Sequence, residues 1–173
     1  MFPMRKSGIS VVLAVLGLCA SGSVSAQTFT TVFNFDGSDG SHPLGLVQGS
    51  DGNFYGTTQA LDGTIFNITP SGTQTTLFTL DGLQKNSGES PEAGLIQGTD
   101  GNFYGTTSAG GANGDGTVFK ITPSGTLTTL HSFDGTDGFS PIAGLIEGTV
   151  GNFYGTTQYG RGRLLHRCRG RRL

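Results

Sequence analysis

The chain has 173 residues, a formal net charge of −2, 31 glycines, no tryptophan and two cysteines. Residues 27–160 hold all 12 acidic side chains and only two lysines, Lys85 and Lys120, so this region repels nucleic acids and anionic lipids and no nucleic-acid partner is expected. Cys19 falls in a predicted leader, which leaves Cys168 without a partner for an intrachain disulfide.

The N-terminus has the pattern of a secretory signal peptide. Two basic residues precede an apolar run of 12 residues, Ile9–Ala20, and small residues lead to a cleavage site after Ala26. The run is shorter than the roughly 20 residues of a membrane-spanning helix, so no permanent membrane span is expected. A lipoprotein would use Cys19, but Leu18 is bulkier than that processing favours. Residues 1–26 are therefore predicted to be a signal peptide, and the protein to be secreted, extracellular or held at the cell surface.

The rest of the chain is a tandem repeat with a period of about 50 residues. Residues Asp51–Thr58 recur letter for letter at Asp100–Thr107, and with one change at Val150–Thr157. Short runs rich in threonine and aromatic residues, separated by Gly-rich turns, are typical of units that bury their apolar faces against copies of themselves. Residues 27–160 are therefore predicted to form one repeat domain.

Each unit is interpreted as four short strands. Asp-Gly and Pro-Ser-Gly sequences between the strands are hairpin signals, because glycine accepts a positive φ and proline presets the turn. The predicted strands are Thr28–Phe35, a lone fourth strand; Gly45–Gln48, Phe54–Thr58, Thr64–Thr69 and Thr73–Leu80; Gly94–Gln97, Phe103–Thr107, Thr117–Thr122 and Thr126–Phe133; and Gly144–Glu147 and Phe153–Thr157. Every connection is short, which predicts antiparallel meanders.

These units predict an all-β fold of β-propeller-like tandem blades, each of four antiparallel strands. The set is incomplete, with about two full blades plus partial ones, so self-association that completes the ring of blades is expected. Gly56, Gly105 and Gly155 fall inside the second strand, where glycine costs about 0.5–1 kcal/mol relative to alanine unless close packing requires it. We interpret them as points where the backbones of neighbouring blades approach.

The tail at residues 161–173 breaks the pattern. It holds six arginines and no acid where a Gly-rich loop and a third strand would continue. Two interpretations stay open: a basic tail for anionic partners, or a frameshifted continuation, since glycine codons read out of register give arginine codons. In both, the final unit ends after its second strand.

The alignment of the repeats argues against a catalytic role for the candidate residues. His131 aligns with Phe33 and Phe78, which predicts a strand residue, and Glu147 aligns with Gln97. No Ser-His-Asp or Cys-His set and no metal cluster of His and Cys has usable spacing. The chain is therefore predicted not to be an enzyme.

Two acidic loops are candidate calcium sites. The loop with Asp36 and Asp39 and its copy with Asp134 and Asp137 each place two carboxylates three residues apart, with carbonyl oxygens beside them. The alternative is that these residues only form turns. No other cofactor is expected.

The repeated Phe-Tyr pairs are candidate stacking platforms for sugars. The three pairs are Phe54 and Tyr55, Phe103 and Tyr104, and Phe153 and Tyr154. Because side chains alternate along a strand, one ring of each pair faces inward, and at least half of the rings are expected to be packing residues.

The repeats also resemble a known family. Residues Gly116–Leu130, Pro141–Gly148 and Gly151–Thr157 are similar to the tandem repeats of GloVer-containing proteins, exported bacterial proteins whose members end in different surface anchors. The resemblance covers residues 28–160. It implies a secreted or surface-held propeller-like repeat protein and supplies no catalytic residue. Family members usually hold more repeats than this chain.

The favoured hypothesis is an exported, non-catalytic repeat protein that acts as a surface binding or structural module for an unknown glycan or protein. Variable loops such as Ser108–Asp115 would lie at the rims of the blades. One alternative is a propeller hydrolase or lyase acting on glycans, which would need non-repeating acids or histidines near the axis. The other is a truncated fragment with no independent function.

Overall fold

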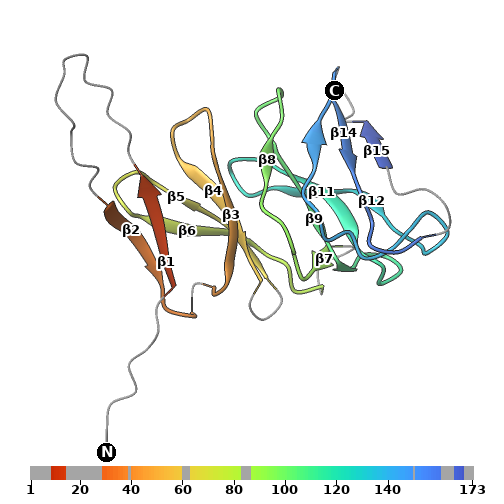
Figure 1. Cartoon of the computed structure of the whole chain (residues 1–173), viewed down its shortest axis with the longest axis horizontal. Helices are drawn as coiled ribbons and strands as arrows, with labels where there is room; N and C mark the ends of the chain where they lie inside the picture. The colour runs from red at the N-terminus through yellow and green to blue at the C-terminus, as the bar shows by residue number, and fades with distance from the viewer. Residues whose placement is uncertain are drawn as a thin grey trace, which may run out of the picture.

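The computed structural model describes residues 9–14, 29–38, 40–59, 63–82, 87–149, 151–160 and 166–169. Every regular element in these ranges is a β-strand, and the strands pair in antiparallel sheets that follow one another in chain order without closing (Figure 1). The prediction of an all-β fold is confirmed. The described ranges contain no helix that is long and apolar enough to cross a membrane.

Two four-stranded sheets form the centre of the molecule. The first sheet contains β3 (Pro43–Gln48), β4 (Phe54–Thr58), β5 (Thr64–Ile68) and β6 (Gln74–Thr79). The second sheet contains β8 (Ile96–Gln97), β9 (Phe103–Thr107), β11 (Thr117–Ile121) and β12 (Leu127–Ser132). In both, each strand pairs with the one before and after it in the sheet, so the predicted four-stranded meander is confirmed for these two units.

The turns have the geometry that their residues favour. Gly52 and Gly101, in the Asp-Gly turns, have φ of 84° and 79°, and Gly72 and Gly125, in the Pro-Ser-Gly turns, have φ of 90° and 91°. A side chain with a Cβ rarely adopts these values, which is why glycine ends each turn. The turn chemistry therefore sets the strand boundaries locally.

A third sheet holds three strands rather than the two that the sequence predicts. It contains β13 (Ile146–Glu147), β14 (Asn152–Gly155) and β15 (His166–Arg169), and β15 lies in the predicted tail. The backbone of β15 pairs with β14 in the register that β11 has on β9: His166 lies opposite Gly155 as Phe119 lies opposite Gly105. A strand edge pairs with another strand through its backbone N–H and C=O groups, so a segment whose sequence departs from the repeat can occupy it.

The predicted fourth strand that precedes the first unit is also paired. β2 (Phe29–Phe35) lies beside β1 (Ile9–Ala14), which comes from the apolar run of the predicted leader. The ladder has an irregularity between Val11 and Val12, matching those between Ile65 and Phe66 and between Val118 and Phe119. β1 thus occupies the place of a third strand, with its register.

A small extra ladder was not predicted. β7 (Gly88–Glu89) pairs with β10 (Ala109–Gly110), and both lie in segments interpreted as loops. Gly111 donates a backbone hydrogen bond to the carbonyl of Ser87 beside this ladder, at 3.1 Å. The connection between β9 and β11 is therefore held against the segment that precedes β8.

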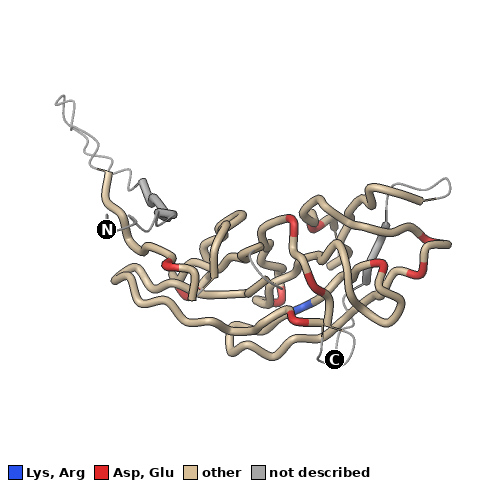
Figure 2. Tube along the Cα trace, turned by 90° about the horizontal axis from the view of Figure 1, so that it is seen from below, with Lys and Arg blue, Asp and Glu red and all other residues tan. Residues whose placement is uncertain are grey.

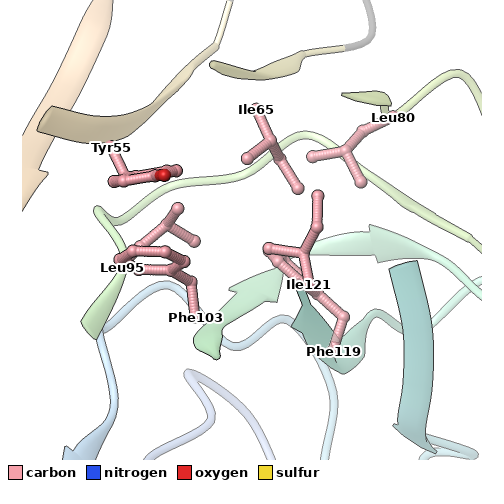
Figure 3. Packing of buried hydrophobic residues seen from close by; sticks show 7 residues of the cluster. All are labelled: Tyr55, Ile65, Leu80, Leu95, Phe103, Phe119 and Ile121. Atoms are coloured by element: carbon pink, nitrogen blue, oxygen red, sulfur yellow. The ribbon is translucent and has the colours of Figure 1, made fainter. Parts of the chain in front are cut away.

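The hydrophobic core is divided among the contacts between successive sheets. The largest cluster joins Tyr55, Ile65 and Leu80 of the first unit to Leu95, Phe103, Phe119 and Ile121 of the second (Figure 3). A second cluster, between the second and third sheets, joins Tyr104, Val118 and Phe133 to Leu145 and Phe153. A third cluster joins Phe35 of β2 to Phe66 and Ile68 of the first sheet. Each sheet therefore buries its faces on the neighbouring units, as the repeat predicts.

The glycines of the second strands have a different role from the predicted one. A Cβ on Gly105 would lie 2.6 Å from the ring of Phe119 on the adjacent strand of the same sheet, and Gly56 has the same relation to Phe66. Neighbouring units approach each other instead at three other glycines. A Cβ on Gly94 would be 2.9 Å from Cα of Gly45, and a Cβ on Gly72 or Gly125 would be 2.6 or 2.8 Å from the carbonyl oxygen of Val32 or Leu77 in the preceding unit. Hence Gly56 and Gly105 make room for a ring, and Gly45 and Gly94 let two backbones meet.

Candidate functional site

The repeated aromatic pairs form the contacts between sheets. The ring of Tyr55 stacks on Phe103 with centroids 3.9 Å apart, and Tyr104 stacks on Phe153 with centroids 3.8 Å apart. All four rings are buried. In the close-up of the first contact, Tyr55 lies over Phe103 and Leu95 (Figure 3). These rings are covered by protein, so they offer no platform to a sugar.

Each buried tyrosine is also held from the turn that precedes its strand. The hydroxyl of Tyr55 donates a hydrogen bond to Asp51 at 2.7 Å, and that of Tyr104 donates to Asp100 at 2.8 Å. The same carboxylates accept bonds from the amides of Asn53 and Asn102. One aspartate thereby fixes both its hairpin and the ring that meets the next unit.

These bonds shift the pKa values of both partners. The hydrogen bond from Tyr55 is the main reason that the pKa of Asp51 lies below its usual value. Burial opposes ionisation of Asp100, but the bonds from Asn102 and Tyr104 together still hold its pKa below normal. Burial, and then the neighbouring aspartate, raises the pKa of Tyr55 and of Tyr104. The aspartates therefore stay charged and the tyrosines neutral at physiological pH.

Polar contacts also cross between units. Glu147 accepts hydrogen bonds from the backbone N–H and the hydroxyl of Thr99 in the preceding unit, at 3.1 and 2.8 Å. One unit earlier, Gln97 accepts a bond from the backbone N–H of Ser50 at 2.9 Å. Glu147 is thus a structural link. The sequence predicted a polar strand position there but gave no partner, although the repeat spacing between these pairs is a signal that could have found one.

A second polar link joins each second strand to the next unit. The hydroxyl of Thr57 donates to the carbonyl of Ala93 at 2.9 Å, and that of Thr106 donates to the carbonyl of Ala143 at 3.1 Å. Both threonines are buried. The threonine-rich motif therefore serves the contact between sheets, with no hydroxyl of this pair left over for chemistry.

The candidate calcium residues lie in turns. Asp134 accepts two hydrogen bonds from Thr136, which lower its pKa, and Asp137 accepts bonds from the backbone N–H of Asp134 and from His131. Asp36 makes the same turn contacts with Ser38, and Asp39 lies outside the described residues. The structure brings Asp134 and Asp137 together in one loop. No group of three or more potential metal ligands occurs among the residues with described side chains, and calcium binding stays a prediction.

The histidines take the places that the alignment gives them. His131 lies on β12 opposite Val118, as Phe78 lies opposite Ile65, with its ring edge-on to Phe133 at 4.8 Å. His42 has a φ of 54°, and its repeat equivalents Ser90 and Ser140 both have 56°. His166, on β15, lies in the tail. The alignment of His42 with two serines is confirmed by this shared left-handed backbone.

The loop at Ser108–Asp115 is held by hydrogen bonds. Its Ala112 N–H donates to the hydroxyl of Ser132 at 2.8 Å, and the Asn113 amide donates to the carbonyl of Phe133 at 3.0 Å. Asp and Glu residues are spread along loops of this kind, and Lys120 is the one Lys or Arg among the residues whose side chains are described (Figure 2). The exposed loops are therefore acidic.

A small hollow lies between the second and third sheets. Its lining is almost wholly apolar and includes Val118, Phe133, Leu145 and Phe153, which belong to the core cluster there. It contains no ionisable side chain, so it supplies no acid or base.

Comparison with known protein families identifies the repeat. A family model described as the Gloeobacter/Verrucomicrobia repeat matches residues 17–164, which is most of the chain. No curated protein sequence matches it.

Proposed function

The chain belongs to the Gloeobacter/Verrucomicrobia repeat family, and on this basis we propose that it is an exported, non-catalytic repeat protein that acts at the cell surface as a binding or structural module. The observation that carries the proposal is the use of the shared residues. Tyr55, Tyr104 and the carboxylates that bind their hydroxyls form the contacts between sheets. Variation is left to the loops, where recognition usually resides.

The proposed architecture is an incomplete β-propeller. Two observations support it: both central sheets are four-stranded meanders, and the contact between one unit and the next is built from equivalent residues each time. Propellers typically have four to eight such blades.

The proposed export rests on the leader at residues 1–26. An export test expresses the whole chain in a secreting bacterial host and measures the intact mass of the protein outside the cytoplasm. The expected product begins at Gln27. A matched variant, Leu13→Arg, interrupts the apolar run and is expected to remain uncut inside the cell. An uncut chain from both genes would overturn the export proposal.

The binding role is tested with the exported protein and a panel of cell-wall polysaccharides. We expect retention on at least one of them without release of new reducing ends. Replacing the loop Ser108–Asp115 by its shorter equivalent Gln59–Asp62 removes β10, and should abolish retention and leave the four-stranded sheets folded, since loop length is where the units differ. Release of reducing ends would favour a glycan hydrolase or lyase instead. His131→Phe, the residue of the sister units, would then show whether that histidine is responsible.

A further inference from the structure

The contact between two successive units has a fixed composition. Its back side, from the earlier unit, has a tyrosine and an aliphatic residue of the first strand: Tyr55 with Val47, and then Tyr104 with Ile96. Its front side, from the later unit, has a leucine and a phenylalanine: Leu95 with Phe103, and then Leu145 with Phe153. The stacked tyrosine and phenylalanine lie at the centre.

The first unit presents a front side that has no such partner among the described residues. We call Leu46 and Phe54 the front face. Leu46 is 39% exposed, whereas its equivalents Leu95 and Leu145 are 5% exposed. Phe54 is half-buried, whereas Phe103 and Phe153 are fully buried. The front face is therefore an apolar surface shaped to receive a tyrosine.

The last unit presents the complementary back side. We call Ile146 and Tyr154 the back face. Ile146 is 66% exposed, although its equivalent Ile96 packs against the core cluster. Tyr154 is half-buried, whereas Tyr55 and Tyr104 are buried. β4, which carries Phe54, and β14, which carries Tyr154, lie toward opposite ends of the row of sheets (Figure 1).

The strand edges complement one another in the same way. Among the described residues, the third sheet has a first, a second and a third strand but no fourth. β2 is a fourth strand that is not preceded by the first and second strands of its own repeat. β15 lies where β11 lies in the second sheet, and β11 pairs with the fourth strand β12. β2 can therefore complete the third sheet of another copy. In the unprocessed chain β1 covers the edge of β2 that this pairing needs.

We propose that the chain, once its leader has been removed, forms a head-to-tail dimer in which the back face of each copy docks on the front face of the other, with Tyr154 stacked on Phe54. The dimer reuses the intrachain contact, so the occupant is a second copy of this chain. Each copy contributes two four-stranded sheets, and the dimer adds two composite sheets, each made of the third sheet of one copy and β2 of the other, which gives six sheets in all. That number lies within the range of closed propellers, which avoid an open-ended filament. The dimer rests on the proposed leader removal, and its closure into a ring rests on the proposed propeller.

The test compares the molar mass in solution of the unprocessed chain and of the chain cut after Ala26. Intact mass reports cutting separately, and if the host does not cut the leader, an inserted protease site after Ala26 does so. The uncut chain should be monomeric, because β1 occupies the edge of β2. The cut chain should be dimeric. A failure of export therefore remains distinguishable from a failure of association.

Two variants test the faces. Leu46→Arg alters the front face, and Ile146→Arg alters the back face; both sites are exposed in the single chain, so the circular dichroism spectrum should be unchanged. Each variant alone should be monomeric, because every interface then has one altered side. An equimolar mixture should recover dimers, since the intact back face of one variant meets the intact front face of the other. Ile142→Arg, exposed but on neither face, is the control and should stay dimeric.

Three outcomes would overturn the proposal. One is a cut wild-type chain that stays monomeric at about 100 μM, a concentration above the micromolar to picomolar dissociation constants of standard-sized interfaces. Another is a dimer that survives both variants, which would place the contact elsewhere. The third is a dimer lost by one variant and not by the other, which would mean a symmetric contact of one face with itself.

Discussion

Glu147 accepts two hydrogen bonds from Thr99, one from its backbone N–H and one from its hydroxyl, and so ties the third sheet to the turn of the second. The same position in the second unit is Gln97, which binds Ser50 of the first. A charged and a neutral side chain thus make the same link. What the position requires is an acceptor oxygen within reach of the preceding turn.

Replacing this acceptor should weaken the attachment of the third sheet. Glu147→Ala is expected to lower the free energy of unfolding by about 1 kcal/mol, the usual net value of such hydrogen bonds. Glu147→Gln should change it by less, because Gln97 makes the equivalent link. Urea unfolding measures both. Equal losses for alanine and glutamine would show that the acceptor oxygen is not what matters.

Removing the hydroxyl of Tyr104 should cost more stability than removing the hydroxyl of Tyr154, its equivalent in the third unit. Tyr104→Phe keeps the ring on Phe153 and removes the donor to the exposed carboxylate of Asp100, which should cost about 0.5–1.5 kcal/mol, the usual net value of a hydrogen bond. Tyr154→Phe is the matched control. Val150 stands where the other units have the aspartate, so that change should cost little. Thermal unfolding of the two variants, followed by circular dichroism, would contradict this prediction if their losses were alike.

The pH dependence of stability should have an acid and an alkaline limb. The pKa values of Asp51 and Asp100 are lowered by folding, so their contribution is complete above about pH 4, near the unfolded value, and is lost as the pH falls through the lower folded values. The pKa values of Tyr55 and Tyr104 are raised. Their contribution is complete below about pH 10 and is lost as the pH rises through the higher folded values.

Urea midpoints measured from pH 2 to pH 11 would trace both limbs. The paired variant Asp51→Asn with Asp100→Asn should flatten the acid limb, since it removes the groups that titrate there. If the acid limb keeps its full slope in this variant, other carboxylates are its cause.

The second-strand glycines should differ in their tolerance of alanine. A Cβ at Gly105 meets the ring of Phe119 at 2.6 Å and Leu95 at 2.9 Å, so Gly105→Ala should cost about 1–3 kcal/mol through overpacking. At Gly155 the Cβ meets only Leu145, at 2.7 Å, among the described residues. Gly155→Ala should therefore cost less. Double substitution of Gly105→Ala with Phe119→Leu should recover part of the loss, and no recovery would rule out the ring as the cause.

Much of the strand pattern could be predicted from the sequence. The predicted strands Phe54–Thr58 and Phe103–Thr107 have the observed bounds, and the other strands of the two central units agree to within one or two residues. Local chemistry suffices for this, because Asp-Gly and Pro-Ser-Gly turns fix where each strand starts and stops. The alignment of the repeats likewise placed His131 on a strand and Glu147 at a polar strand position.

The candidate site was less predictable, because the roles of its residues depend on a neighbouring unit. Alternation along the strand predicts that one ring of each Phe-Tyr pair is buried, but both Phe103 and Tyr104 are buried, since the second sheet is covered on both faces. The partner of Glu147 likewise lies in the preceding unit. Nothing in a single repeat carries that information.

The sequence by itself determined the all-β class, the repeat, the hairpin turns and the membership of a repeat family, because these follow from local backbone preferences and from residues that recur. Only the tertiary structure decided which residues meet across sheets, and that β1 and β15 occupy the places of third strands. The physical reason is that a strand edge is recognised through its backbone groups, which every sequence has, while the stacking of Tyr55 on Phe103 requires two faces brought together by the whole chain.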